Sequence, residues 1–180
     1  AVGMYGKITG AGTLTVNNTG AIKSEKDSSN NYYTGTLGMV LENTAITATN
    51  SGSIDLRGNG SIGVYNKDGK FEMTNGSIYV DGNKSVGVYS NVNTTLYPAS
   101  QTKVTLGTVE AQGTGSIALY AEKSSGSDTI IGLGNNVNIK ASNGALAFYT
   151  SIDAGNNPTG HFNIAHASDT VNVEIGSNGT

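Results

Sequence analysis

The chain has 180 residues, a length that suits one domain and allows a sizeable core. Gly, Ser, Thr and Asn account for 86 of these residues, charged residues for 13%, and the formal net charge is −3. The ten basic residues are scattered, which excludes the dense basic face of a nucleic-acid-binding protein, and the absence of Cys excludes disulfides. No run approaches the roughly 20 apolar residues of a membrane-spanning helix.

A five-residue pattern recurs along the chain, with copies that start at residues 1, 36, 61, 85, 116 and 145. The clearest copies are SIGVY (61–65) and SVGVY (85–89), and the others are AVGMY (1–5), TLGMV (36–40), SIALY (116–120) and ALAFY (145–149). Each copy alternates with period two, which predicts a β-strand. This alternation predicts that Ile62 and Val64 face inward, whereas Ser61, Gly63 and Tyr65 face outward.

Two further short segments accompany the pentads, one before most copies and one after each copy, and they also alternate with period two. Before the pentads we place SIDL (53–56), SIYV (77–80), TVEA (108–111) and NVNI (136–139), together with TLTV (13–16). After them we place KITG (7–10), TAIT (44–47), FEMT (71–74), KVTL (103–106), TIIGL (129–133) and HFNI (161–164). The repeat unit is therefore predicted to contain three strands, joined by turns rich in Gly, Asn and Asp.

A repeat of 24 to 35 residues with three short strands predicts an all-β fold, a parallel β-helix of about six coils over residues 1–180. Equivalent residues would form stacked columns about 4.8 Å apart. The predicted interior columns are Ile62, Val86, Ile117 and Leu146; Val64, Val88, Leu119 and Phe148; and Ile54, Ile78 and Val109. A β-sandwich is the alternative fold, although it does not by itself require a repeated three-strand unit.

Repeats such as GSIDLRGNGSIGVY (52–65) and GSIYVDGNKSVGVY (76–89) resemble the passenger domains of large type V autotransporter adhesins, above all fusobacterial ones. The resemblance covers nearly the whole chain. It implies a right-handed β-helix that is displayed on the surface of a Gram-negative bacterium and acts in adhesion to host cells or other bacteria. It also implies an upstream signal peptide and a downstream outer-membrane barrel, so we expect this chain to be a fragment of a longer passenger. No binding residue transfers from the resemblance.

One motif suggests a cofactor site. Gly58, Gly60 and Gly63 spell G-x-G-x-x-G after a strand, as in a dinucleotide-binding loop. Such a loop must open a helix, but a strand end and a turn follow Gly63, and the pattern recurs at 113–118 in the same place of its repeat. We therefore predict turns of the repeat and no cofactor.

Catalytic and metal sites find little support in the sequence. His161 and His166 are the only histidines, no G-x-S-x-G elbow is present, and no metal-ligand spacing occurs. Asp55 and Glu110 would lie on one outer column, with Tyr79 between them, about 10 Å apart. This is near the wide limit for the carboxylate pair of an inverting glycosidase. We predict no enzyme, no catalytic residue and no metal, with a polysaccharide-active β-helix enzyme as the alternative.

Binding residues are expected outside the regular coil, because loops that break a solenoid repeat often carry function. Insertions are predicted at 23–34, 91–101, 123–127 and 153–160. The candidate partner-binding residues are Tyr32, Tyr33 and Tyr97, which would contact a protein or glycan receptor. A column of Tyr65, Tyr89, Tyr120 and Tyr149, beside Gly63, Gly87, Ala118 and Ala147, is interpreted as an aromatic ladder on the outer surface, with a binding strip as the alternative. A purely structural spacer remains a further alternative for the whole chain.

Overall fold

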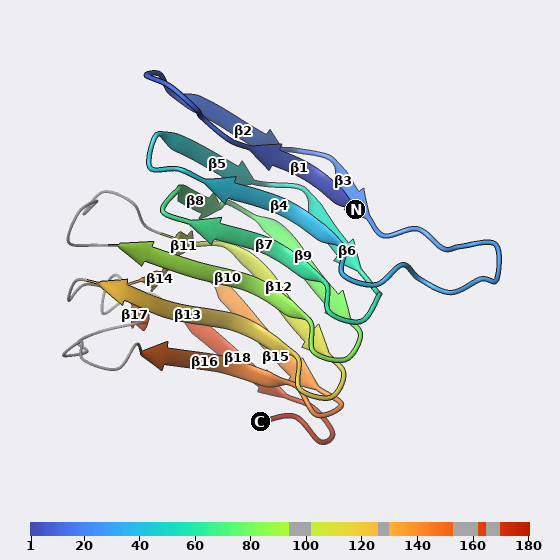
Figure 1. Cartoon of the computed structure of the whole chain (residues 1–180). Helices are drawn as coiled ribbons and strands as arrows, with labels where there is room; N and C mark the ends of the chain where they lie inside the picture. Colours follow the sequence, from blue (N-terminus) through green and yellow to red (C-terminus); the bar gives the residue numbers. More distant parts are fainter. Residues whose placement is uncertain (94–101, 126–129, 153–161, 165–169) are drawn as a thin grey trace.

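The computed structural model describes residues 1–93, 102–125, 130–152, 162–164 and 170–180. These residues form 18 β-strands, and none of them lies in a helix that could cross a membrane. Every third strand belongs to the same sheet, so the chain builds three sheets of six parallel strands (Figure 1).

Sheet A contains β1 (Val2–Gly6), β4 (Leu37–Glu42), β7 (Ile62–Lys67), β10 (Val86–Asn93), β13 (Ile117–Ser125) and β16 (Leu146–Ile152). Sheet B contains β2 (Leu14–Asn18), β5 (Ile46–Asn50), β8 (Lys70–Met73), β11 (Thr102–Val104), β14 (Ile131–Leu133) and β17 (Phe162–Ile164). Sheet C contains β3 (Ala21–Lys23), β6 (Ser53–Leu56), β9 (Gly76–Asp81), β12 (Gly107–Gln112), β15 (Val137–Ser142) and β18 (Val171–Ile175). Three consecutive strands, one from each sheet, make one coil, and coils 1 to 6 stack in chain order. The predicted parallel β-helix with three strands per coil is confirmed.

The first and last coils differ from the sequence-based assignment. TLTV (13–16) was predicted to precede a pentad, but β2 pairs with β5 in sheet B, and the sheet C strand of coil 1 is β3, which pairs with β6. KITG (7–10) was predicted as a strand, but none of its residues lies in one, because β1 ends at Gly6 and the chain is irregular up to β2. The sequence analysis also missed β18. Strands of sheets B and C show the same alternation with period two, so the pattern does not tell them apart. In addition, a strand of only three residues such as β3 is too short to show a clear alternation.

Two of the three predicted interior columns are confirmed. Val64, Val88 and Leu119 are fully buried, and Phe148 packs against the same core although it is partly exposed. In sheet C, Ile54, Ile78 and Val109 are buried opposite them. Burial of each such side chain contributes roughly 1.5–3 kcal/mol, so the repeated columns stabilise a chain that has few large apolar residues.

The third predicted interior column is wrong, because the pentad does not keep a strict alternation. A Cβ built on Gly63 would lie 2.5 Å from the Ile78 Cγ2 atom, so Gly63 faces the interior. Its buried neighbour Val64 also faces the core, and the alternation therefore breaks between these two residues. Ile62 is consequently turned outward and is only half-buried. The small residues predicted beside the tyrosines are inside instead, where the β-branched column of sheet C fills the space that they leave.

The first residue of each pentad also faces inward, contrary to the prediction for Ser61. Thr36, Ser61, Ser85 and Ser116 are buried at the corner where each coil enters sheet A. The hydroxyls of Thr36 and Ser61 are 2.8 Å apart, and the Ser61 and Ser85 amides donate to the hydroxyls of the next coil at 3.1 and 3.0 Å. Because each buried hydroxyl has a partner, this polar column costs little stability.

Two glycines of the fingerprint, Gly58 and Gly60, lie in a turn of the coil, as predicted, whereas Gly63 lies in β7. A Cβ on Gly58 would lie 1.9 Å from the Tyr33 carbonyl oxygen, so the residue allows two backbones to approach each other. Gly60 has a φ of 66°, a left-handed conformation that favours glycine. The equivalent turn position holds Lys84 in the next coil, with a φ of 58°.

Replacing Lys84 by glycine is expected to stabilise the protein, because an L-residue in the left-handed region costs about 1 kcal/mol. Chemical denaturation of Lys84→Gly should give a free energy of unfolding about 1 kcal/mol higher than that of the wild type. Gly60→Ala should lose a similar amount, since its Cβ would meet open space and only the backbone conformation matters. As a control, Lys70→Gly in strand β8 should lower stability; a gain there would show that loss of the lysine side chain, rather than φ, is responsible.

Candidate interaction surface

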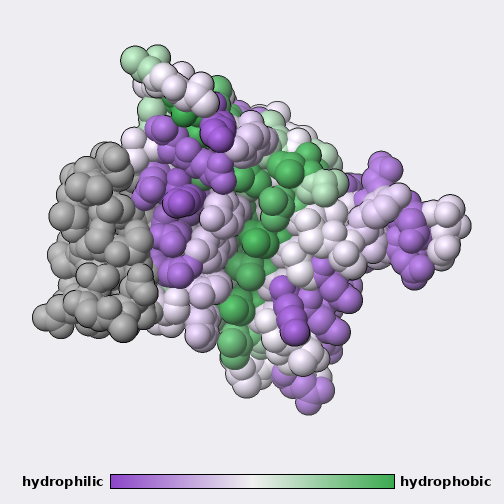
Figure 2. All heavy atoms as spheres, in the orientation of Figure 1, coloured by the Kyte–Doolittle hydropathy of each residue, from purple (hydrophilic) through white to green (hydrophobic). Residues whose placement is uncertain are grey.

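A hydrophobic stripe runs down the outer face of sheet A, from the first coil to the last (Figure 2). The in-register outward residues that form this aliphatic stripe are Val2, Leu37, Ile62, Val86, Ile117 and Leu146. Val2 is exposed and the other five are half-buried. A continuous apolar patch on a face that is turned towards solvent is typical of an interaction site. The sequence analysis placed this column in the core, so the site was missed.

A column of aromatic side chains lies beside the stripe on the same face. Its members are Tyr5, Tyr65, Tyr89, Tyr120 and Tyr149, in register from coil to coil, and on coil 2 the buried Val40 takes the place of a tyrosine. The Tyr65 and Tyr89 rings stack at 5.0 Å with an interplanar angle of 10°, and the next two pairs meet edge to face at 5.1 and 5.0 Å. These contacts confirm that the predicted aromatic ladder is formed, and they stabilise neighbouring coils.

The tyrosine hydroxyls are held by a third column, two residues further along each strand. The Tyr5 hydroxyl donates to the Glu42 carboxylate at 2.8 Å, and the Tyr89 hydroxyl donates to the Glu122 carboxylate. The Tyr120 hydroxyl lies 3.2 Å from that of Ser151. Burial and the hydrogen bond to Glu122 both raise the pKa of Tyr89 above the ordinary tyrosine value, so Tyr89 is neutral at physiological pH. These three hydroxyls therefore have polar partners, and the third column, which consists of Glu42, Lys67, Asn91, Glu122 and Ser151, forms a polar border to the apolar columns on the same face.

The insertion between β3 and β4 projects sideways from the stack as an arm (Figure 1). Lys26 and Tyr32 form an antiparallel bridge, and the Lys26 Nζ atom lies 4.9 Å from the centre of the Tyr32 ring. The Asp27 carboxylate accepts hydrogen bonds from the Ser29 and Asn31 amides at 2.8 and 3.0 Å, which closes the tip. The arm therefore has local order of its own.

The three tyrosines that were predicted to bind a partner differ in their exposure to solvent and in whether the structure describes them. Tyr32 is half-buried beneath Lys26, whereas Tyr33 is exposed. Tyr33 lines a mainly apolar hollow of about 270 Å³ at the open side of coil 1, with Ile22, Leu37 and Leu56 among its other walls. Tyr97 lies outside the described residues. Of the two candidates that the structure describes, Tyr33 is thus the one that lines a hollow.

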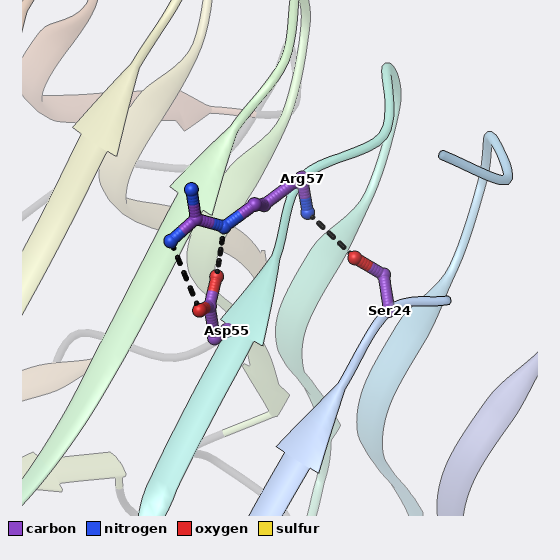
Figure 3. Close-up of polar contacts among 3 residues, drawn as sticks. All are labelled: Ser24, Asp55 and Arg57. Carbon is purple, nitrogen blue, oxygen red and sulfur yellow. Dashed lines mark hydrogen bonds and ion pairs between the residues drawn. The ribbon is translucent and has the colours of Figure 1, made fainter. Parts of the chain in front are cut away.

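The two candidate catalytic carboxylates, Asp55 and Glu110, lie on the outer face of sheet C in the predicted column, with Tyr79 between them. The Arg57 guanidinium holds the Asp55 carboxylate through two contacts of 2.9 and 3.1 Å, and the Arg57 amide donates to the Ser24 hydroxyl at 2.9 Å (Figure 3). Glu110 accepts a hydrogen bond from Gln112 at 2.7 Å. Both carboxylates therefore have local structural partners, which fits a surface network better than a general acid and base.

Within the described residues no three His, Asp or Glu side chains gather into a group that could hold a metal ion. Comparison of the chain with known protein families, curated proteins and solved structures finds no match. The site therefore has to be interpreted from its own chemistry.

Two valines in one strand test the orientation of the pentad. Val88 is fully buried and Val86 is half-buried on the outer stripe. Val88→Ala should lower the free energy of unfolding by about 2 kcal/mol, and Val86→Ala by less than about 1 kcal/mol, because only Val88 leaves a cavity. Urea denaturation of the two variants measures the difference. Equal losses would contradict the outward position of Val86.

The Tyr79 ring provides a pH-dependent signal on sheet C. Burial raises its pKa from 10 to about 12, with a further contribution from Asp81 and an opposing one from Arg57. Because the folded-state pKa is raised, the stability that this group contributes is complete below pH 10 and is lost as the pH rises towards 12. The absorbance titration of the wild type minus that of Tyr79→Phe should show a transition near pH 12. A transition near pH 10 would contradict this environment.

Proposed function

We propose that the chain is a surface-exposed passenger segment of a type V bacterial autotransporter that acts in adhesion to host cells or other bacteria, as a stalk and a binding surface. The observation that carries the proposal is the outward aliphatic stripe, which runs the length of a regular β-helix. The resemblance of its repeats to fusobacterial passengers supports the same function.

The geometry of the stack supports the proposed stalk role. Six strands at a spacing of about 4.8 Å place the first and last coils roughly 24 Å apart, and every strand pairs with its equivalent in the next coil. Such a solenoid extends by adding coils, so it can hold a binding surface away from a membrane. The proposed location is the extracellular surface of a Gram-negative outer membrane.

The binding role is assigned to the stripe together with the arm that ends at Tyr33. The stripe offers a continuous line of partly exposed apolar side chains, and the mostly polar arm adds the exposed ring of Tyr33. A receptor protein or glycan would contact them with its own apolar surface. A polysaccharide-active enzyme is less well supported, because Asp55 is already engaged by Arg57 in two contacts.

An adhesion assay tests this proposal on particles coated with the 180-residue chain. The stripe variant carries Ile62→Ser, Val86→Ser and Ile117→Ser, and a second variant replaces residues 25–34 by a short turn. We expect the stripe variant to lose at least tenfold in the number of host or bacterial cells bound, and the arm variant to lose less. Circular dichroism and thermal unfolding establish that each variant is folded.

The matched control substitutes outward residues of sheet B, Glu72→Ser and Lys103→Ser, which leave the stripe intact. Equal cell binding by the wild type, the stripe variant and this control would favour the spacer alternative. Cleavage of polysaccharide by the wild type that is lost in Asp55→Asn/Glu110→Gln would instead establish the enzyme alternative.

A further inference from the structure

The tyrosine column of sheet A contains one pair of rings that lie face to face, in the middle of the stack. Tyr65 in β7 and Tyr89 in β10 occupy equivalent positions on adjacent parallel strands. Their ring centroids are 5.0 Å apart and their planes differ by 10°. Because the two rings leave in-register backbone positions and are nearly parallel, each ring carbon lies about 5 Å from its counterpart. The Cε atoms beside the two hydroxyls therefore face each other.

The next contacts in the column have a different geometry. Tyr120 meets Tyr89 at an interplanar angle of 84° and meets Tyr149 at 89°. In such an edge-to-face contact one ring turns its edge towards the face of the other, so the carbons beside the two hydroxyls are not opposed. Among the described residues, the face-to-face arrangement of tyrosines therefore occurs once, between Tyr65 and Tyr89.

A carboxylate is positioned to take the hydroxyl proton of Tyr89. The Tyr89 hydroxyl donates a hydrogen bond to the Glu122 carboxylate, and the Asn91 Nδ2 atom donates to the same hydroxyl at 3.4 Å. Loss of one electron makes a phenol strongly acidic, so the proton leaves together with the electron. A carboxylate that already accepts this hydrogen bond can take up the proton directly. The site thus favours removal of one hydrogen atom from Tyr89.

The composition of the chain leaves few other side chains that a one-electron oxidant could attack. The sequence contains no Cys and no Trp. Of its three methionines, Met39 and Met73 are fully buried, and Met4 packs against the core. Tyr65 and Tyr89 are each partly exposed on the outer face of sheet A. Since oxidation follows accessibility, we expect one-electron oxidants to act on the tyrosines.

We propose that Tyr65 and Tyr89 form a site of oxidative modification, at which a haem peroxidase with hydrogen peroxide joins the two rings by a carbon–carbon bond. The product is a dityrosine cross-link within one chain. It ties coil 3 to coil 4 on the outer face of sheet A. The reaction does not depend on whether the stripe binds a receptor.

The reaction balances as a two-electron oxidation. Each ring loses one electron and its phenolic proton, so both O–H bonds break and two phenoxyl radicals form; the Tyr89 proton passes to Glu122. Small side-chain rotations bring the facing Cε atoms together, and the radicals couple to form the carbon–carbon bond. The hydrogens on these two carbons then move to the phenolic oxygens as protons, which restores both aromatic rings and both hydroxyls. The two electrons and two protons that were released reduce one hydrogen peroxide to two waters.

Peptide mapping tests the site. The 180-residue chain is treated with a haem peroxidase and hydrogen peroxide, and dityrosine is detected by its fluorescence. Trypsin separates Tyr65, in peptide 58–67, from Tyr89, in peptide 85–103. Mass spectrometry should find these two peptides linked, at the sum of their masses less two hydrogen atoms. Because the bond forms within one chain, the cross-linked product should run as a monomer and its yield should not depend on protein concentration.

Thermal unfolding of the purified product tests its effect on the fold. A covalent bond between residues 65 and 89 restricts the unfolded chain, so the midpoint should rise by roughly 5 °C or more. A midpoint that is unchanged or lower would contradict the expectation that the bond braces the two coils.

Phenylalanine variants assign the two rings, because they keep the packing and remove only the hydroxyl. Tyr65→Phe and Tyr89→Phe should each abolish the linked peptide. The matched controls Tyr97→Phe, in the same tryptic peptide as Tyr89, and Tyr79→Phe, on sheet C, should retain it. Glu122→Gln, which removes the proton acceptor, should slow the cross-linking about tenfold or more.

Circular dichroism establishes that each variant is folded. Linked peptides that persist in Tyr89→Phe, or cross-links that join only different copies of the chain, would overturn the assigned pair. A wild-type chain that forms no dityrosine while a control peptide containing tyrosine does so would overturn the site itself. An unchanged rate in Glu122→Gln would overturn the role of that carboxylate in the proton transfer.

Discussion

Parallel stacking in register is the constraint on which the rest of this structure depends. Each residue lies on its equivalent in the next coil about 4.8 Å away, so a side chain that suits one coil must suit the column. Tyrosine therefore follows tyrosine, and the buried serines at the sheet A corner bond to one another. Polar residues are tolerated inside because the column itself supplies their partners, as between Asn18 and Asn50, whose amides meet at 2.8 Å.

The same constraint explains why small and large columns face each other. Sheet A places Gly38, Gly63 and Gly87 opposite the β-branched residues Ile54, Ile78 and Val109, and a Cβ on any of these glycines would lie within 2.7 Å of the opposing side chain. Close packing of a narrow interior thus depends on pairs of columns rather than on single residues. A methyl group added to one column requires a smaller side chain across the core.

The sequence could predict most of the strands, the number of coils and which residues stack on one another, because repeated segments with period two leave a strong pattern. It could not predict which face of the pentad is inside. SIGVY fits a strict alternation that buries Ile62 and Val64, yet the actual arrangement buries Gly63 and Val64 together. The preference for Gly63 comes from Ile78 in another sheet, and no local pattern contains that contact. The position of β2 was missed for a related reason, since strands of sheets B and C alternate alike and only pairing with β5 distinguishes them.

This difference between inner and outer faces decides how the outward columns are interpreted. Stacking and burial dictate the interior, but they leave the outer surface free to vary. The tyrosines have a structural reason of their own, because their rings pack together and their hydroxyls bond to Glu42, Glu122 and Ser151. Leu37, Ile62 and Val86 are half-buried and in register, so their neighbours in the column cover part of each side chain while the rest faces solvent. The part that stays exposed forms a continuous apolar line beside the tyrosines, and the proposed binding role depends on this line.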